Sequence, residues 1–400
     1  MKQAFSKMLL LSAVILTDML AGMELDLFVP GFVELQNSFN LTPFLVESLL
    51  SVNFLGYCLS LFFVGKLADY YGRKPIILVG LMIFIVGSVL CLMAPFYSFL
   101  LVGRFMQGLG IAAPAILSFL IIADLYPLKK QQSLFAILNG IMNASVGVAP
   151  VIGSYITLYF HWQGNFAALL ILGILAFFMA LFFVPLYPQT KPKENFPGEG
   201  YFNILRSEPL RLGITHFILQ FTPYWVFVGM SPLLYMGALG VSLKHFGYYQ
   251  GALAFVFAIG SLLFGMVVAR YDQLKMLKIS GYMFVFGFMS LGTVSFLDSF
   301  DPIVITLAFL VFVIASIAPS AILYPILLEV MPRAKGRIAA LMQGGRLLFA
   351  ALSLQVAGYF YQDSFRNVGM IIMVFIALST MTLFTIVNRG GETETGKNIL

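Results

Sequence analysis

PIILVGLMIFIVGSVLCLMAP, residues 75–95, contains no charged residue and is long enough to decide the fold. As a helix it would extend about 30 Å at 1.5 Å per residue, which is the thickness of the hydrocarbon core of a bilayer. Similar windows recur along the whole chain, so we predict an all-α membrane protein with twelve transmembrane helices. They cover residues 8–30, 44–65, 75–95, 98–123, 133–160, 163–187, 210–236, 246–269, 277–297, 303–328, 337–361 and 366–388.

The composition points to the same class of protein. Of the 400 residues, 60% are hydrophobic and only 10% are charged, whereas soluble domains carry about 25% charged residues. Two Cys and three His are too few for a disulfide framework or a clustered metal site, so we expect no metal and no bound cofactor. The first apolar run contains Asp18, Glu24 and Asp26 and lacks a small-residue cleavage site, so we interpret it as the first helix and not as a signal peptide.

Lysine and arginine are distributed unevenly between the two sides of the predicted helices. Nineteen lie on one side, and only Lys244 and Arg366 lie on the other. Because basic residues accumulate in short cytoplasmic loops, both termini are predicted to be cytoplasmic in a multi-pass protein of the inner (cytoplasmic) membrane. The net charge of +6 therefore reflects the orientation of the chain in the membrane, and we expect no nucleic-acid partner.

A polar interval at 188–209, PQTKPKENFPGEGYFNILRSEP, contains four Pro and two Gly. It is typical of a linker, here cytoplasmic, between an N-terminal six-helix bundle (1–187) and a C-terminal six-helix bundle (210–391), with a tail at 392–400. GKLADYYG at 65–72 and GMVVARYD at 265–272 form a weak internal repeat with an offset of 200 residues. Two related six-helix halves favour a secondary transporter.

The loop GKLADYYGRK, residues 65–74, resembles the signature loop between helices two and three of the major facilitator superfamily, and only Tyr70 departs from the pattern. The matching residues are Gly65, Leu67, Ala68, Asp69, Gly72, Arg73 and Lys74. The resemblance implies the two-bundle fold of that superfamily. It also implies that Asp69 and Arg73 join an acid at the inner end of helix four, here Asp124, in a conformational latch of the outward-facing state.

Helices four and one carry two further motifs. LLVGRFMQGLGIAAP, residues 100–114, is similar to the helix-four motif of proton-coupled members, with matches at Arg104, Gln107, Gly108, Gly110, Ala112 and Ala113. DMLAGMELDLFVPGF, residues 18–32, resembles the first-helix motif of the twelve-helix drug:proton antiporters of the bicyclomycin/chloramphenicol-resistance type. Asp26 and Pro30 carry that resemblance, and some members have an acid eight positions earlier, as Asp18 is here.

Helix five matches the antiporter motif of this family only in part. Pro150 and Gly153 match, whereas Ser145, Ala149 and Ser154 replace glycines with other small residues. A kinked helix with a smooth packing face is still expected. The departures leave export and uptake both open.

Helical depth suggests how the intramembrane charges pair. Asp26 lies about 27 Å along helix one from its inner end, and Arg104 lies about 9 Å from the outer end of helix four, so we predict that they meet. Arg346 is level with Asp18, and Glu24 points roughly 160° away from Asp26. Three acids against two arginines leave one net negative charge, which a proton or a cationic substrate would neutralise. We therefore predict proton coupling by Asp26 and Arg104, with Asp18 or Glu24 as the accessory acid.

Polar residues spaced four apart share helix faces and are candidates for lining a substrate cavity. The candidates are Asn53, Tyr57, Gln107, Asn139, Asn143, Gln220, Tyr224, Trp225 and Arg346. Met and Phe are also abundant, but in so apolar a chain they are more often lipid-facing or core residues.

Together these features predict a transporter that is not an enzyme. It would export small lipophilic or cationic compounds by drug:proton antiport, as a monomer in the lipid bilayer, driven by the proton gradient alone. A permease for a specific metabolite or siderophore is the alternative. No GxxxxGK[ST] motif is present, which excludes an ATP-driven pump, and no nucleophile with a base at membrane depth supports an enzyme. A channel would be expected to show ring-forming polar repeats, and none is seen.

Overall fold

The computed structural model describes residues 2–126, 128–186, 201–331 and 334–392, which form helices and turns without a strand. The predicted all-α class is therefore confirmed. Eleven helical stretches in this part of the chain are long and apolar enough to cross a membrane. One of them, Gly140–Phe183, contains both the fifth and the sixth predicted spans. The eleven stretches thus account for all twelve predictions.

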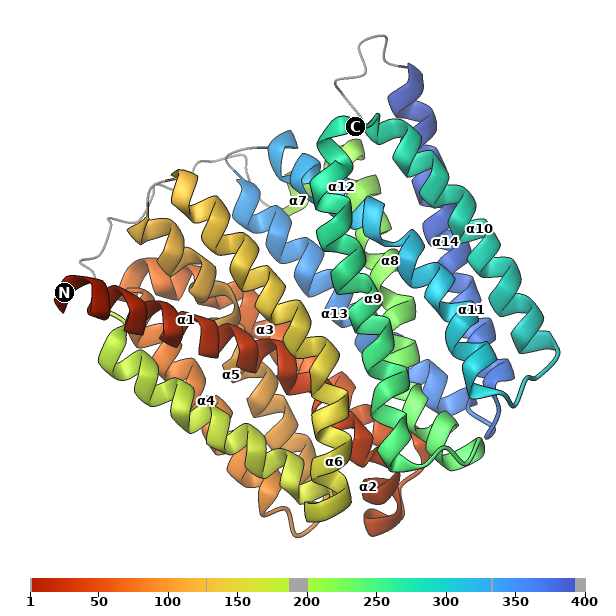
Figure 1. Ribbon diagram of the computed structural model, residues 1–400, viewed down its shortest axis with the longest axis horizontal. Coiled ribbons are helices and arrows are strands. Elements are labelled where there is room, and N and C mark those ends of the chain that lie inside the picture. Colours follow the sequence, from red (N-terminus) through yellow and green to blue (C-terminus); the bar gives the residue numbers. More distant parts are fainter. Residues whose placement is uncertain (1, 127, 187–200, 332–333, 393–400) are drawn as a thin grey trace. The chain divides into compact units, whose positions relative to one another are not determined.

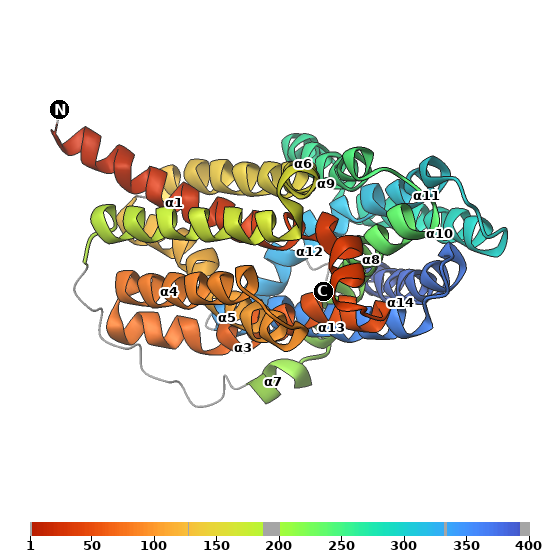
Figure 2. The ribbon, with the colours of Figure 1, turned by 90° about the horizontal axis from the view of Figure 1, so that it is seen from below.

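The chain divides into two compact units, Met1–Glu194 with Ser242–Gly251, and Asn195–Val241 with Ala252–Leu400. The first unit contains α1 (Lys2–Asp26), η1 (Val29–Gly31), α2 (Phe32–Phe39), α3 (Pro43–Tyr71), α4 (Arg73–Leu92), α5 (Tyr97–Leu125) and α6 (Leu128–Phe183). Within it, α5 packs against both α3 and α4, while α1 packs along α6 (Figure 2). These contacts bring α1, α3 and α5 around one polar centre.

Helix α1 ends at Asp26, earlier than the predicted span of 8–30. Pro30 explains the early end, because a proline has no N–H to donate to the carbonyl four residues before it. The chain continues in the one-turn 3-10 helix η1 and then in α2. Asp26 therefore sits at a helix end.

The range Leu128–Phe183, labelled α6, consists of two helices that meet in a sharp bend at His161, whose φ of 59° lies in the left-handed region. Glu34 of α2 stabilises the bend: one carboxylate oxygen accepts the Trp162 N–H at 2.9 Å, and the other lies 2.7 Å from Nδ1 of His161. The carboxylate thus caps the start of the helical segment after the bend. This bend is the boundary between the fifth and sixth predicted spans.

The second unit contains α7 (Tyr201–Arg206), α8 (Glu208–Pro232), η2 (Leu233–Ala238), most of α9 (Leu243–Val267), η3 (Val268–Arg270), α10 (Gln273–Phe296), α11 (Pro302–Ala315), α12 (Ile317–Val330), α13 (Lys335–Phe360) and α14 (Phe365–Glu392). Helix α14 packs against both α8 and α10 (Figure 1). The predicted linker at 188–209 includes α7 and the start of α8, and its residues 188–200 lie outside the described part of the chain.

Candidate functional site

A buried ion pair forms the centre of the first unit. Nη1 of Arg104, from α5, lies 2.7 Å from Oε1 of Glu24, from α1, and both side chains are almost completely buried. Asn53 of α3 donates its amide to the same Glu24 oxygen at 2.7 Å and to the Arg104 carbonyl oxygen at 3.1 Å. Three helices are therefore joined through one carboxylate.

The network continues from Arg104 across α5 to α4. Arg104 donates to Oε1 of Gln107 at 2.7 Å, and Gln107 donates to the hydroxyl of Ser88 at 2.8 Å. The guanidinium also lies 3.9 Å from the centre of the Phe28 ring, in a cation–π contact. A buried charge is stable only when it is paired and hydrogen-bonded, and Arg104 meets both conditions.

Two glycines allow this network to form. A methyl group at Gly108 of α5 would overlap the carbonyl oxygen of Asn53, and one at Gly56 of α3 would overlap the carbonyl oxygen of Phe105. The backbones of α3 and α5 therefore touch directly, as small residues permit in membrane helices. This close approach places Asn53 beside Arg104.

Asp26 is buried at the end of α1, and its Oδ1 accepts a hydrogen bond from Gln250 of α9 at 3.0 Å. Its second oxygen has no hydrogen-bond partner among the described residues. Gly153 of α6 approaches the same end of α1, because a side chain there would overlap the carbonyl oxygen of Leu27. The predicted smooth face of helix five thus packs against the helix end that carries Asp26.

Asp18 lies two turns before Asp26 on α1 and is also fully buried. Neither of its carboxylate oxygens has a hydrogen-bond partner in the described part of the chain. The adjacent Thr17 instead contacts Ser118 of α5, with 2.9 Å between their hydroxyl oxygens. Among the described residues, Asp18 is therefore a carboxyl group without a stabilising polar contact.

The predicted pairing of Asp26 with Arg104 is wrong, because Arg104 pairs with Glu24. The two acids differ in depth by only about 3 Å, but they point roughly 160° apart around the helix. Depth along the helix therefore could not distinguish the two acids. Glu24 is the acid on the face of α1 that contacts Arg104.

Glu47 of α3 is a fully buried acid outside the predicted site, and neither of its carboxylate oxygens has a partner among the described residues. Glu47 lies inside the second predicted span, 44–65, so the sequence signal for this residue was an acid within an apolar window. Gln250 had a similar signal as a lone amide in the apolar window 246–269. Glu47 is roughly 200° around the helix from Leu49, whose carbonyl oxygen accepts from Arg104, so it occupies a different face of α3.

The residues predicted to line a substrate cavity make different contacts, each within its own unit. Asn53 and Gln107 belong to the Arg104 network, whereas Gln220 donates to the Ser316 carbonyl oxygen at 2.8 Å and to the Ser320 hydroxyl at 2.6 Å. The guanidinium of Arg346 lies 5.2 Å from the centre of the Phe221 ring, and the side chain of Asn139 is outside the described residues. The other predicted positions are half-buried: Tyr57, Asn143, Tyr224 and Trp225.

Two residues of the predicted latch lie at the junction of α3 and α4. Arg73 and Asp69 form an ion pair at 2.6 Å, and Gly72 has a φ of 94° that a residue with a side chain would adopt only under strain. Gly65 has open space around it. The Asp124 side chain lies outside the described residues, so its part in the latch stays a prediction.

A sequence profile of the Major Facilitator Superfamily matches residues 14–354. Among curated proteins, multidrug resistance protein MdtL of Salmonella heidelberg (strain SL476) is 28% identical over 275 residues, or 67% of this chain and 68% of that protein. The protein of the same name from Escherichia coli O9:H4 (strain HS) is 32% identical over 222 residues. That match covers 54% of this chain and 55% of the relative, so the chain spans about half the length of this E. coli protein.

Two solved structures share the fold. A D-xylose-proton symporter has a TM-score of 0.76 at 17% identity, covering 95% of this chain and 97% of that chain. A bacterial homologue of the human lysosomal transporter Spinster, in an inward-facing and unoccupied conformation, has a TM-score of 0.70 at 17% identity, covering 96% and 97%. At such low identity these similarities concern the fold alone. From its profile match, its membrane-spanning helices and this fold, the chain belongs to the Major Facilitator Superfamily of membrane transporters.

Proposed function

We propose that this transporter exports small lipophilic or cationic compounds in exchange for protons. The observation that carries the proposal is the charge balance of α1, which buries three carboxylates. Among the described residues only Glu24 has a cationic partner, whereas Asp18 and Asp26 have none. An ionised carboxylate without a cation is costly at membrane depth, so a proton or a cationic substrate is the natural partner.

The three acids have different parts in this proposal. Glu24 is held by Arg104 and Asn53, so it fixes the helices around the site. Asp26 has one oxygen bonded to Gln250 and one without a hydrogen-bond partner among the described residues, which favours it as the principal exchange site, with Asp18 as the accessory acid. A proton and a cationic substrate would then compete for the same carboxylates, which couples uptake of one to release of the other.

Export of drugs is supported by the name of the two relatives, multidrug resistance protein. The remaining parts of the proposal follow from the sequence: inner-membrane location, cytoplasmic termini, bundles at 1–187 and 210–391, and a monomer without a cofactor. Alternating access would use the Asp69–Arg73 pair, together with Asp124, to hold one of the two states.

The test uses purified protein in liposomes that contain a pH-sensitive dye, with ethidium as a lipophilic cation. Under an imposed proton gradient, ethidium should move against the protons, and Asp26→Asn should abolish the linked pH change. Asp363→Asn is the matched control, because Asp363 lies in the turn between α13 and α14 with a φ of 51° that Asn also adopts readily. If a single metabolite equilibrates across the membrane and no compound moves protons, the permease alternative replaces antiport.

A further inference from the structure

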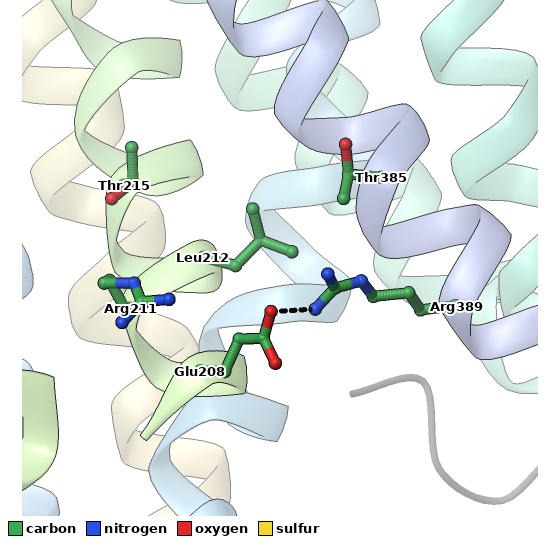
Figure 3. Close-up of a pocket in the computed structure, with 6 residues that line it drawn as sticks. All are labelled: Glu208, Arg211, Leu212, Thr215, Thr385 and Arg389. Atoms are coloured by element: carbon green, nitrogen blue, oxygen red, sulfur yellow. Dashed lines mark ion pairs between the residues drawn. The ribbon is translucent and has the colours of Figure 1, made fainter. Parts of the chain in front are cut away.

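A pocket of about 200 Å³ lies between the first turns of α8 and the last turns of α14 (Figure 3). At roughly 30 Å³ for each water in the liquid, its volume would hold several waters or a phosphate group. It is lined by Glu208, Arg211, Leu212, Thr215, Thr385 and Arg389, all of the second unit. None of these residues belongs to the proposed coupling site.

The pocket carries two positive charges against one negative charge. Arg389 extends from α14 toward α8, where its guanidinium lies 2.7 Å from the Glu208 carboxylate (Figure 3). Both side chains of this pair are more than half exposed. An exposed pair of this kind contributes little to stability, so Arg389 can bind another anion at low cost. Arg211 lies one turn from Glu208 and adds a second positive charge, so the pocket has one positive charge in excess.

The short helix α7 indicates the depth of the pocket in the membrane. Phe202 is 65% exposed, and Tyr201 and Leu205 are also exposed, whereas Ile204 is buried against Leu210. An exposed aromatic face on a short helix is typical of the boundary between lipid and water. Helix α8 starts two residues after α7 ends, so its first turn lies at the level of the lipid headgroups.

The pocket has charged, hydroxyl and apolar lining residues, which match the phosphate, the ester groups and the acyl chains of a phospholipid. Glu208, Arg211 and Arg389 supply the charged part of the lining. Thr215 lies about 6 Å further along α8 than Arg211 and has an exposed side chain, which suits an ester carbonyl oxygen. Leu212 supplies an apolar surface between them. Guanidinium groups bind phosphate oxygens well because they present several N–H donors in one plane.

We propose that this pocket binds the phosphate group of an anionic phospholipid between Arg211 and Arg389. Glu208 forms an ion pair with Arg389 and would therefore compete with the lipid phosphate for this guanidinium. Basic pockets between transmembrane helices at the membrane surface are suited to such headgroups. The proposal does not depend on the substrate or on the direction of transport.

The test measures thermal unfolding of the purified full-length protein in detergent micelles with added phosphatidylglycerol or with phosphatidylcholine of the same acyl chains. Phosphatidylglycerol should raise the unfolding temperature more. Arg211→Gln and Arg389→Gln should each weaken the lipid response about five-fold in half-maximal concentration, from roughly one surface interaction lost per arginine. Glu208→Gln should strengthen the response, because it removes the competing carboxylate.

Arg206→Gln is the matched control, because this arginine lies on α7 with its guanidinium over the Phe202 ring and outside the pocket. Each variant is compared with itself without lipid, so a general loss of stability does not obscure the result. Equal weakening by Arg206→Gln and Arg211→Gln would overturn the proposal in favour of diffuse surface charge. A weaker response in Glu208→Gln would also overturn it, since the ion pair would then be part of the binding surface. If inorganic phosphate reproduces the arginine-dependent stabilisation, the pocket binds a free phosphate ion and the lipid assignment fails.

Discussion

Replacing Glu24 with Gln removes the only negative charge that contacts Arg104 among the described residues, without changing the size of the side chain. The guanidinium would keep neutral partners: the Gln107 oxygen at 2.7 Å, the Leu49 carbonyl oxygen at 3.4 Å and the Phe28 ring at 3.9 Å. Removing one partner of a buried ion pair costs about 3–5 kcal/mol, because the other charge stays buried. We expect the unfolding temperature to fall by roughly 5 °C.

Asp26→Asn is the matched comparison, since it also removes one buried negative charge from α1. Asp26 has no cationic partner among the described residues, and Asn can still accept the hydrogen bond from Gln250. Asp26→Asn should therefore lower the free energy of unfolding by less than about 1 kcal/mol. The assay is thermal unfolding of each variant in the same detergent, with size-exclusion chromatography to confirm folding.

The double variant Glu24→Gln with Arg104→Gln gives the decisive third measurement. Because it removes both charges, it should recover most of the stability lost in Glu24→Gln. The reasoning is refuted if Asp26→Asn destabilises as much as Glu24→Gln. That result would mean that Arg104 depends on Asp26, as depth along the helices had suggested.

Gly108→Ala should destabilise the protein by about 1–3 kcal/mol in thermal unfolding, because the new methyl group overlaps the carbonyl oxygen of Asn53. Gly140→Ala is its control, since it meets open space, and should be neutral or slightly stabilising. Asp69→Asn should slow transport in liposomes and leave equilibrium ligand affinity within a few-fold; complete loss of binding by a folded variant would contradict a latch. Glu47→Gln should leave stability unchanged or raise it, because it removes a buried acid that has no polar partner in the described part of the chain; a loss above about 2 kcal/mol would reveal a hidden partner.

The sequence predicted the spans well because an apolar window of about 20 residues has few alternatives to a membrane helix. It also singled out the charged members of the polar centre, Glu24 and Arg104, because charges at membrane depth are rare and must be satisfied. The early end of α1 at Asp26 has a local cause, which is Pro30. The predicted break between spans five and six coincides with the non-helical backbone at His161.

Partner choice within the polar centre could not be predicted. Which acid meets Arg104 depends on the rotation of α1 about its own axis, and packing sets that rotation. The hydrogen bond from Gln250 to Asp26 joins residues 224 positions apart in the sequence, and no local pattern indicates such a contact. The signal for Glu47 was present in its window but lay close to the predicted end of the helix.

The direct backbone contact between α3 and α5 also has a consequence for motion. No side chain separates Gly108 from the carbonyl oxygen of Asn53. The two backbones are therefore in direct contact, and the helices cannot slide or tilt against each other by rearranging side chains. Pairs of spin labels on α3 and α5 should therefore report one fixed separation throughout the transport cycle. The pair would act as a strut, and the deformation that opens and closes the transporter must occur at other helix contacts.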